Sequence, residues 1–357
     1  MSSLIAGENS DDTNTDDSVA RHIEECCLAF LKSLVENRKN PNGHVILSNP
    51  RFCFNSFVFG NAVDNKGYKM KLTPKNSRIV AQMVRTVSMI HELRVLKIYK
   101  TKRDLFYERK SLFGVQRNLN NSINRVCYWL GMDPTPGYVR SSGHGLVIGQ
   151  LKIYESTGIV DCSVKATLID EFFGARLSTT AQCILVVEKD ATFQRLIGEG
   201  FLKLFPNVLL VTGKGYPDVA TRMMLKKLSN LPLFGLLDCD PHGIEIAMTY
   251  KYGTSSKKFG MENLKLPHFE WIGLSRHLLP KFVIPTSQFL PLQKRELVKV
   301  EKLCQRTASL GDKALLDELI RMRQCGNKLE LEAVSGIAPG SMCRYLLRTK
   351  LSKYAVE

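Results

Sequence analysis

Three acidic residues stand where apolar runs end in the second half of the sequence. Glu188 directly follows CILVV (183–187), and Asp238 follows LFGLL (233–237), with Asp240 two residues further on. Such runs are typical of buried parallel strands, and ligands lie beyond the carboxyl ends of these strands. Three carboxylates at one edge repel one another, and a hard cation such as Mg²⁺ or Mn²⁺ relieves that repulsion. The spacing therefore predicts a metal site formed by these three residues.

The same acidic residues also fit a second interpretation, in which they cap helices. Asp190 lies at the start of a helical run, and Asp240 precedes Pro241, a residue favoured in the first turn of a helix. For any one of these acids alone, capping is the better interpretation. For Glu188, Asp238 and Asp240 together, a metal site is the better one.

Two other stretches carry side chains suited to phosphate chemistry. The turn GKGYP (213–217) offers backbone N–H groups, including that of Gly215, and the ammonium group of Lys214 to a phosphate. Arg222, in the helical run that follows, suits a further phosphate contact, although a solvated helix charge is an equally ordinary interpretation.

The stretch KRDLFYERK (102–110) sets Tyr107 among charged residues. The phenol is either an amphipathic surface group or a reactive one, and the local sequence does not decide between them. Arg103 lies four residues earlier, so the two side chains share one face if the stretch is helical.

The elements that position these residues follow from hydrophobic periodicity. In the second half, strand-like runs CILVV, NVLLVT and LFGLL alternate with helical runs DATFQRLIGEGFLKLF, DVATRMMLKKLS and PHGIEIAMTYKYG. This alternation predicts an α/β domain with a Rossmann-like parallel sheet and right-handed crossovers. The last hundred residues are expected to be mixed and mostly helical.

The first half has a different pattern. An acidic segment, expected to be disordered, precedes an amphipathic helix and the short strand-like runs HVILS, FCFNSFVF and YKMKLT. Helical runs follow, one from Ser77 as a candidate cap and one ended by Gly131, and then GLVIGQLKIYES and IVDCSV, which alternate like a β-ribbon. Helices followed by a ribbon are the order of a winged-helix domain. We therefore expect a disordered segment (1–17), a winged-helix domain (18–160) and a sheet domain with a helical C-terminal extension (170–357).

Composition narrows the class of protein. A chain of 357 residues is expected to form two domains, and its net charge of +16 favours a polyanionic partner, although some basic proteins have no nucleic-acid role. No apolar run is long enough to span a membrane, and the N-terminus has no signal-peptide layout. Ten cysteines without a CxxC pair indicate reduced thiols in the cytosol or nucleus and make a zinc site unlikely.

These motifs together resemble a known family. An acidic residue after the first strand and D-x-D after the third resemble the Toprim pattern of topoisomerases, primases and some nucleases. VVEKDATFQRL, VTGKGYPDVATR and LLDCDPHGIEIAMTYKYG resemble the meiotic DNA double-strand-break transesterases, eukaryotic relatives of the topoisomerase VI A subunit. KRDLFY resembles the catalytic motif of that family's winged-helix domain, and GLVIGQL resembles its wing.

The resemblance implies a mechanism and a setting. Tyr107 would attack a DNA phosphate and remain joined to the 5′ end, Arg103 would grip that phosphate, and Glu188, Asp238 and Asp240 would hold Mg²⁺. The implied partners are double-stranded DNA, a second copy of the chain, a subunit like topoisomerase VI B, and other proteins of the meiotic break machinery. The implied location is the nucleus, on chromosomes, with no membrane.

Departures from the family pattern affect three positions. Phe106 stands where many relatives carry a second tyrosine, which leaves Tyr107 as the nucleophile. His144 stands where a DNA-contacting lysine is expected, and Tyr216 either stacks near DNA or packs on the sheet.

Three alternative functions remain open at this point. The first is a topoisomerase VI A subunit that reseals DNA with an ATPase partner, since this chain has no GxxxxGK[ST] motif of its own. The others are a Toprim nuclease that does not need Tyr107 and a non-catalytic DNA-binding scaffold.

Overall fold

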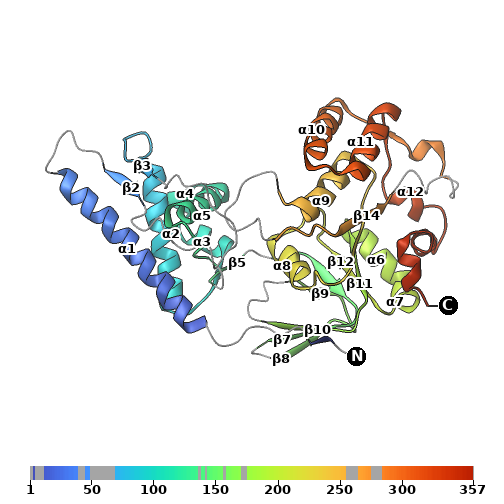
Figure 1. Ribbon diagram of the computed structural model, residues 1–357, viewed down its shortest axis with the longest axis horizontal. Helices are drawn as coiled ribbons and strands as arrows, with labels where there is room; N and C mark the ends of the chain where they lie inside the picture. The colour runs from blue at the N-terminus through green and yellow to red at the C-terminus, as the bar shows by residue number, and fades with distance from the viewer. Residues whose placement is uncertain are drawn as a thin grey trace. The chain divides into compact units, whose positions relative to one another are not determined.

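The computed structural model describes residues 3–4, 12–38, 45–48, 69–135, 138–140, 143–155, 158–169, 175–254, 264–274 and 284–356. The chain forms two compact units, each with a hydrophobic core of its own (Figure 1). The first unit comprises mainly Glu8–Ser142. The second comprises Met1–Gly7, Gly143–Ser255 and Leu264–Glu357.

The first unit is built mainly from helices, and its three longest ones pack on one another: α1 (Asp12–Arg38), α2 (Ser77–Val95) and α5 (Gln116–Leu130). Their apolar faces bury Trp129 and Met83 completely. Two short helices join α2 to α5, namely α3 (Lys102–Glu108) and α4 (Lys110–Phe113). Strands β2 (Ile46–Ser48) and β3 (Lys69–Lys71) pair antiparallel, and β4 (Lys100–Thr101) pairs parallel with β5 (Val139–Arg140). The helices expected in the first half are thus confirmed, and Gly131 ends α5 in the left-handed conformation.

Three local expectations for the N-terminal part differ from the structure. Helix α1 begins at Asp12, inside the segment expected to be disordered (1–17), and acidic residues suit the first turns of a helix. Ser77 is the first residue of α2 rather than its cap, because Asn76 holds the cap position. Ser3–Leu4, also inside the segment expected to be disordered, form strand β1, which pairs with β10 (Arg176–Thr179). The strand expected at FCFNSFVF lies outside the described residues.

The second unit contains a six-stranded sheet in the order β14-β13-β11-β12-β6-β9. Four neighbouring strands run parallel, as expected from the alternating pattern: β11 (Cys183–Val187), β12 (Val208–Thr212), β13 (Leu233–Leu236) and β14 (Phe269–Gly273). The connecting helices are α6 (Asp190–Gly198), α7 (Phe201–Leu204), α8 (Val219–Lys227) and α9 (Pro241–Tyr252). Every residue of β11 and β12 is buried, which explains their uninterrupted apolar sequences.

The predicted ribbon lies in the second unit rather than in the helical one. Strand β6 (Leu146–Ile148) pairs antiparallel with β12 and β9 (Thr167–Leu168), so it extends the sheet. Strands β7 (Leu151–Glu155) and β8 (Gly158–Asp161) form a hairpin that joins β10 in a separate four-stranded sheet. The unit boundary therefore falls at Gly143 and not near residue 160. The reason is burial, because the apolar side chains of β6 and β7 belong to the core of the second unit.

The C-terminal part is mostly helical, as expected. Helices α10 (Lys294–Leu310) and α11 (Lys313–Cys325) pack on each other and on α9 (Figure 1). Strand β15 (Leu290–Pro291) pairs with β16 (Asn327–Lys328). The chain ends in the short helices α12 (Glu332–Ser335) and α13 (Ser341–Leu346), and 3₁₀ turns occur at Thr286–Gln288 and Lys350–Tyr354.

Two further expectations concern thiols and membranes. The cysteines in the described part of the chain are free thiols, and most of them are buried. Among the described helices, none combines the length and the apolar character needed to span a bilayer.

Candidate active-site residues

The three predicted metal ligands come together at one edge of the sheet in the second unit. Strands β11 and β13 are hydrogen-bonded neighbours, so Glu188 and Asp238 emerge side by side where these strands end. A carboxylate oxygen of Glu188, Oε2, accepts a 2.9 Å hydrogen bond from the backbone N–H of Asp238. Glu188, Asp238 and Asp240 are all buried. The three acids thus lie near one another at this edge, and their role as metal ligands stays a prediction.

The burial of these acids changes their protonation. Burial, followed by repulsion from Asp238 and Asp240, raises the pKa of Glu188 to about 8. Burial also raises the pKa of Asp238 to about 6, although Lys189 opposes that change with a hydrogen bond and its positive charge. Carboxylates whose pKa values are raised in this way bind a cation at the expense of a proton.

Asp240 also caps a helix. Its Oδ1 atom accepts a 2.6 Å hydrogen bond from the N–H of Gly243 at the start of α9, and Pro241 occupies the first turn. A Cβ atom on Gly243 would lie 2.2 Å from the carbonyl oxygen of Asp238, so this position admits only glycine. The capping interpretation of Asp240 is therefore confirmed and coexists with its place in the cluster. It does not hold for Asp190, because Lys189 occupies the cap position of α6.

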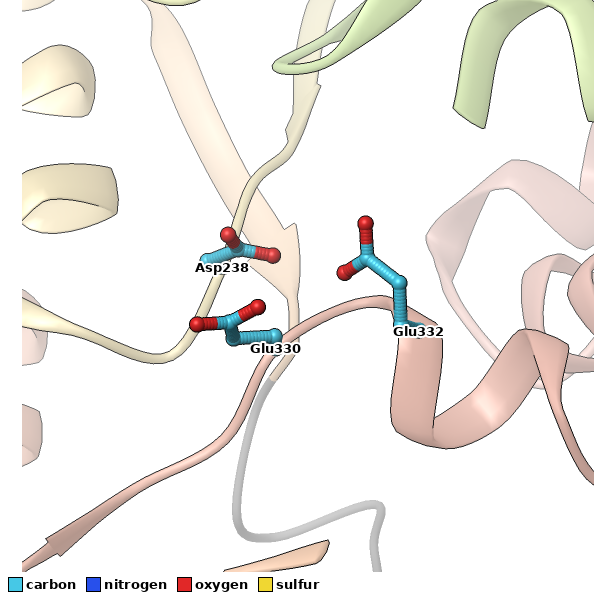
Figure 2. Close-up of side chains that lie close together, drawn as sticks. All are labelled: Asp238, Glu330 and Glu332. Atoms are coloured by element: carbon cyan, nitrogen blue, oxygen red, sulfur yellow. The ribbon is translucent and has the colours of Figure 1, made fainter. Parts of the chain in front are cut away.

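Three residues of this edge were not predicted from the sequence. The carboxylates of Glu330 and Glu332 approach Asp238, and a ligand atom of each lies within 4.8 Å of the others. Figure 2 shows Asp238 on the segment that leaves β13, Glu330 on the segment that leads into α12, and Glu332 at the start of that helix. The ammonium group of Lys189 lies 2.9 Å from Asp238 Oδ2 and 2.9 Å from Glu332 Oε2. The alternation in LELE was a signal for two acids on one side, but nothing local linked it to β13.

The ligand atoms available at this edge are of the kind that a hard divalent cation prefers. They are all carboxylate oxygens, and in the described part of the chain Glu188 Oε1 and Asp240 Oδ2 accept no hydrogen bond. Mutual repulsion among buried carboxylates is what such a cation relieves. Among the described residues, the acids with ligand atoms within 4.8 Å of one another are Asp238, Glu330 and Glu332, so the assignment of an ion to Glu188, Asp238 and Asp240 stays a prediction.

The turn GKGYP is fixed to this edge through its backbone. The N–H of Gly215 donates to the carbonyl oxygen of Glu188 at 2.7 Å, and the N–H of Lys214 donates to Thr212 Oγ1 at 3.1 Å. Two amides that we expected to face a phosphate are therefore used internally, and that part of the prediction is wrong. The side chain of Lys214 remains about one-third exposed, 3.4 Å from Asp190.

Tyr216 belongs to a polar cluster formed by the turn, α9 and α10. Its hydroxyl donates to Glu245, lies 3.2 Å from His242 Nδ1 and accepts from the ammonium group of Lys299 at 3.0 Å. Lys299 also forms a 2.7 Å ion pair with Glu245. The ring stays nearly half exposed, so Tyr216 is neither packed on the sheet nor free to turn.

The two remaining residues predicted to contact DNA have other surroundings. Arg222 is 2% exposed, and its guanidinium contacts the carbonyl oxygen of Leu264 at 3.4 Å. Burial also lowers its pKa, and it has no surface from which to reach a phosphate, so its predicted role is wrong. His144 remains half exposed, but both its backbone N–H and its Nδ1 contact Asp218 Oδ2, at 2.7 and 2.9 Å. Asp218 in turn caps α8.

In the first unit, helix α3 presents Tyr107 to solvent. Thr101 and Asp104 form a capping box that begins this helix. Phe106 is buried, whereas the Tyr107 side chain is 56% exposed. The guanidinium carbon of Arg103 lies 5.9 Å from the centre of the Tyr107 ring, which confirms that these two residues share a face.

Comparison with known proteins agrees with both units. Residues 183–351 match the family model of the Toprim domain shared by the A subunit of topoisomerase 6 and Spo11, and residues 78–135 match the model "Type IIB DNA topoisomerase". The Caenorhabditis elegans "Meiotic recombination protein spo-11" is 34% identical over 98% of this chain and 81% of its own length. The chain belongs to the topoisomerase VI A/Spo11 family.

Other relatives give the same assignment. The human "Meiotic recombination protein SPO11" is 34% identical over 78% of this chain and 72% of its own length. The Schizosaccharomyces pombe "Meiotic recombination protein rec12" is 27% identical over 87% of this chain and 90% of its own length. The family is one of DNA-cleaving enzymes with a Toprim domain.

Proposed function

We propose that this member of the topoisomerase VI A/Spo11 family initiates meiotic recombination by making DNA double-strand breaks, with Tyr107 as its nucleophile. The observation that supports this most directly is the exposure of Tyr107 beside Arg103 on helix α3, in a chain whose Toprim unit gathers three buried carboxylates. A hydroxyl that must reach a DNA phosphate has to be accessible, and this one is.

The proposed reaction is a transesterification. The Tyr107 oxygen forms a bond to a backbone phosphorus, and the bond from phosphorus to the 3′ oxygen breaks. The tyrosine loses its proton, the departing 3′ oxygen gains one, and the 5′ end remains linked to the protein as a phosphotyrosine. The guanidinium of Arg103 suits a phosphate oxygen because it offers several N–H groups in a planar fork.

Glu188, Asp238 and Asp240 are the proposed ligands of the divalent metal. The ion held by these residues would supply positive charge for the developing negative charge on a departing oxygen and for a phosphate. The chain's own contribution is to bury these carboxylates beside one another. The hydrogen bond from Asp238 N–H to Glu188 then fixes the Glu188 side chain.

The partners follow from the chemistry and from the family. A double-strand break needs two nucleophiles, so we propose that a homodimer acts on double-stranded DNA, with Tyr107 of one copy serving the metal site of the other. Proteins resembling the topoisomerase VI B subunit, together with the rest of the meiotic break machinery, are the proposed further partners. The proposed site of action is the chromosome, in the nucleus.

The deciding experiment compares Tyr107→Phe with Tyr154→Phe, a change at another exposed tyrosine of the chain. The full chain is incubated with double-stranded DNA and Mg²⁺, and breaks and 5′-linked protein are scored separately. We expect Tyr107→Phe to abolish both products and Tyr154→Phe to retain both. Breaks that persist in Tyr107→Phe without linked protein contradict the proposal and favour a metal-dependent Toprim nuclease.

A second function with the same residues is cleavage followed by resealing, which is the activity expected of topoisomerase VI. Addition of an ATPase partner of the topoisomerase VI B type and ATP separates the two. Relaxation of supercoiled DNA under those conditions indicates resealing, and linear product alone indicates a break-forming enzyme.

A further inference from the structure

The ammonium group of Lys189 occupies the centre of an acidic cluster on the side of Asp238 that faces the C-terminal segment. It lies 2.9 Å from Asp238, 2.9 Å from Glu332 and 3.5 Å from Glu330. One ammonium group therefore serves three carboxylates, which resembles the arrangement in which proteins hold a cation.

The geometry of the cluster does not depend on Lys189 alone. The backbone of Leu329 forms two hydrogen bonds with that of Cys239, at 2.9 and 3.0 Å, and the N–H of Leu331 donates to Asp238 Oδ1 at 2.7 Å. These bonds hold the segment that carries Glu330 and Glu332 against the end of β13. With the ammonium group in place, ligand atoms of the three carboxylates lie within 4.8 Å of one another.

We propose that Lys189 is a built-in cation that fills the position between Asp238, Glu330 and Glu332, so that a divalent ion does not bind there. Asp238 is also one of the three acids proposed to hold the catalytic ion, and its Oδ1 atom accepts the N–H of Leu331, so Lys189 sets how much negative charge Asp238 offers to that ion. The inference depends on the proposed function only for the ion held by Glu188, Asp238 and Asp240. Lys189 is accordingly a positioning residue for the metal site.

The physical basis is a competition between a tethered cation and a free one. The ammonium group is present at high effective concentration because it is part of the chain, and it donates up to three hydrogen bonds. A divalent ion entering the same position would have to displace it against repulsion at close range. Replacing Lys189 by an uncharged residue of similar length removes the competitor and retains the three ligands.

The test counts Mn²⁺ ions bound to the full chain by electron paramagnetic resonance, without reference to DNA cleavage. We expect Lys189→Met to bind one more Mn²⁺ per chain than the wild type, and Lys189→Arg to bind the wild-type number. Adding Glu332→Gln to Lys189→Met removes the extra ion. Lys251→Met is the matched control, because Lys251 pairs with the single buried carboxylate of Asp312 at 2.6 Å.

The outcomes separate this inference from the proposed function. If Glu188→Gln removes the wild-type ion but not the extra ion of Lys189→Met, both hold. If the wild type binds no Mn²⁺ and Lys189→Met binds one ion, the metal site of the proposed function fails and the inference stands. A folded Lys189→Met chain with the wild-type number of ions overturns the inference.

A second variant keeps the inference testable if Lys189→Met does not fold. In Glu330→Gln combined with Glu332→Gln, the ammonium group is retained and Asp238 is its only acidic partner among the three. We expect the Mn²⁺ dissociation constant to rise by at least about threefold, because the whole positive charge then bears on Asp238. An unchanged dissociation constant in this variant also overturns the inference.

Discussion

The acidic edge of the second unit and the tyrosine helix of the first are constructed in opposite ways. Glu188, Asp238 and Asp240 are all less than a tenth exposed and are held by hydrogen bonds from backbone N–H groups or from Lys189. Tyr107 is more than half exposed, and α3 contributes mainly the buried Leu105 and Phe106 to its own unit.

This difference is one of electrostatic cost to the folded protein. Buried carboxylates carry an electrostatic cost that the fold has to offset, and their raised pKa values are the sign of it. An exposed phenol carries no such cost, and the two carboxylates of α3 are engaged elsewhere, Asp104 with Thr101 and Glu108 with Lys100. The acidic edge is thus arranged by folding, whereas the proposed role of Tyr107 depends on groups outside its own helix.

The first prediction concerns Tyr107, the exposed residue of this comparison, and has the largest expected effect. Tyr107→Phe should lower DNA cleavage on the order of 10⁵-fold, as expected when a nucleophile is removed. The free energy of unfolding should change by less than about 0.5 kcal/mol, because the hydroxyl lies at the surface. Cleavage assays and denaturant unfolding of the same preparation check both parts. A clearly destabilised variant would mean that the phenol holds α3 in place and is not simply presented to solvent.

The second prediction concerns Glu188, one of the three buried acids. Glu188→Gln should lower metal-dependent cleavage by at least about 10²-fold, because it removes a charged ligand. At pH 9 without metal, the same change should raise the free energy of unfolding by roughly 1–3 kcal/mol, since the wild type must bury an ionised carboxylate there.

Glu199→Gln is the matched control for this prediction. Glu199 is half-buried and likewise accepts a hydrogen bond from a backbone N–H, that of Cys343 at 3.1 Å. It should change neither cleavage nor the stability at pH 9 by a comparable amount. Loss of stability in Glu188→Gln at pH 9 would contradict the view that this carboxylate is held at a cost.

The two halves also differ in how far the sequence alone could predict them. The runs CILVV and LFGLL, each followed by an acid, were sufficient to predict the parallel strands and the convergence of Glu188 with Asp238, because strand ends of a parallel sheet meet at one edge. The i, i+4 spacing of Arg103 and Tyr107 similarly predicted one helical face.

What the sequence could not predict depends on contacts between distant segments. Glu330 and Glu332 reach Asp238 only because Leu329 pairs with Cys239, and no local pattern encodes that pairing. Arg222 has the periodicity of a surface residue in its helix, yet a later segment covers it at Leu264. The ribbon at residues 146–161 was assigned to the wrong unit for the same reason, since β6 pairs with a strand that lies about 60 residues later.

The third prediction concerns protons at the acidic edge. Because the pKa of Glu188 is raised from 4.5 to about 8, the metal-free protein should lose stability as the pH rises from about 4.5 through 8. Metal binding must release that proton, so the Mn²⁺ dissociation constant should fall by about tenfold per pH unit between pH 6 and 8. Calorimetric titration at several pH values checks this slope. A pH-independent constant would contradict ionisation of Glu188 on metal binding, and Glu188→Gln should flatten the slope.

The last prediction concerns Tyr216, whose partly exposed ring and bonded hydroxyl make it intermediate between the two extremes. Tyr216→Phe should cost about 1 kcal/mol of stability or less, because it removes the hydroxyl and leaves the 2.7 Å ion pair of Lys299 with Glu245 intact. If the ring stacks on a base, Tyr216→Ala should weaken DNA binding by about 1–3 kcal/mol, whereas Tyr216→Phe should leave it within a few tenths. Lys299→Met, which removes the cation but keeps the ring, separates stacking from phosphate attraction, since only the latter adds to the salt dependence of binding. Equal losses of DNA affinity in the alanine and phenylalanine variants would assign the effect to the hydroxyl and its polar cluster. Tyr216 would then resemble the buried acids, which are held by hydrogen bonds, more than the exposed Tyr107.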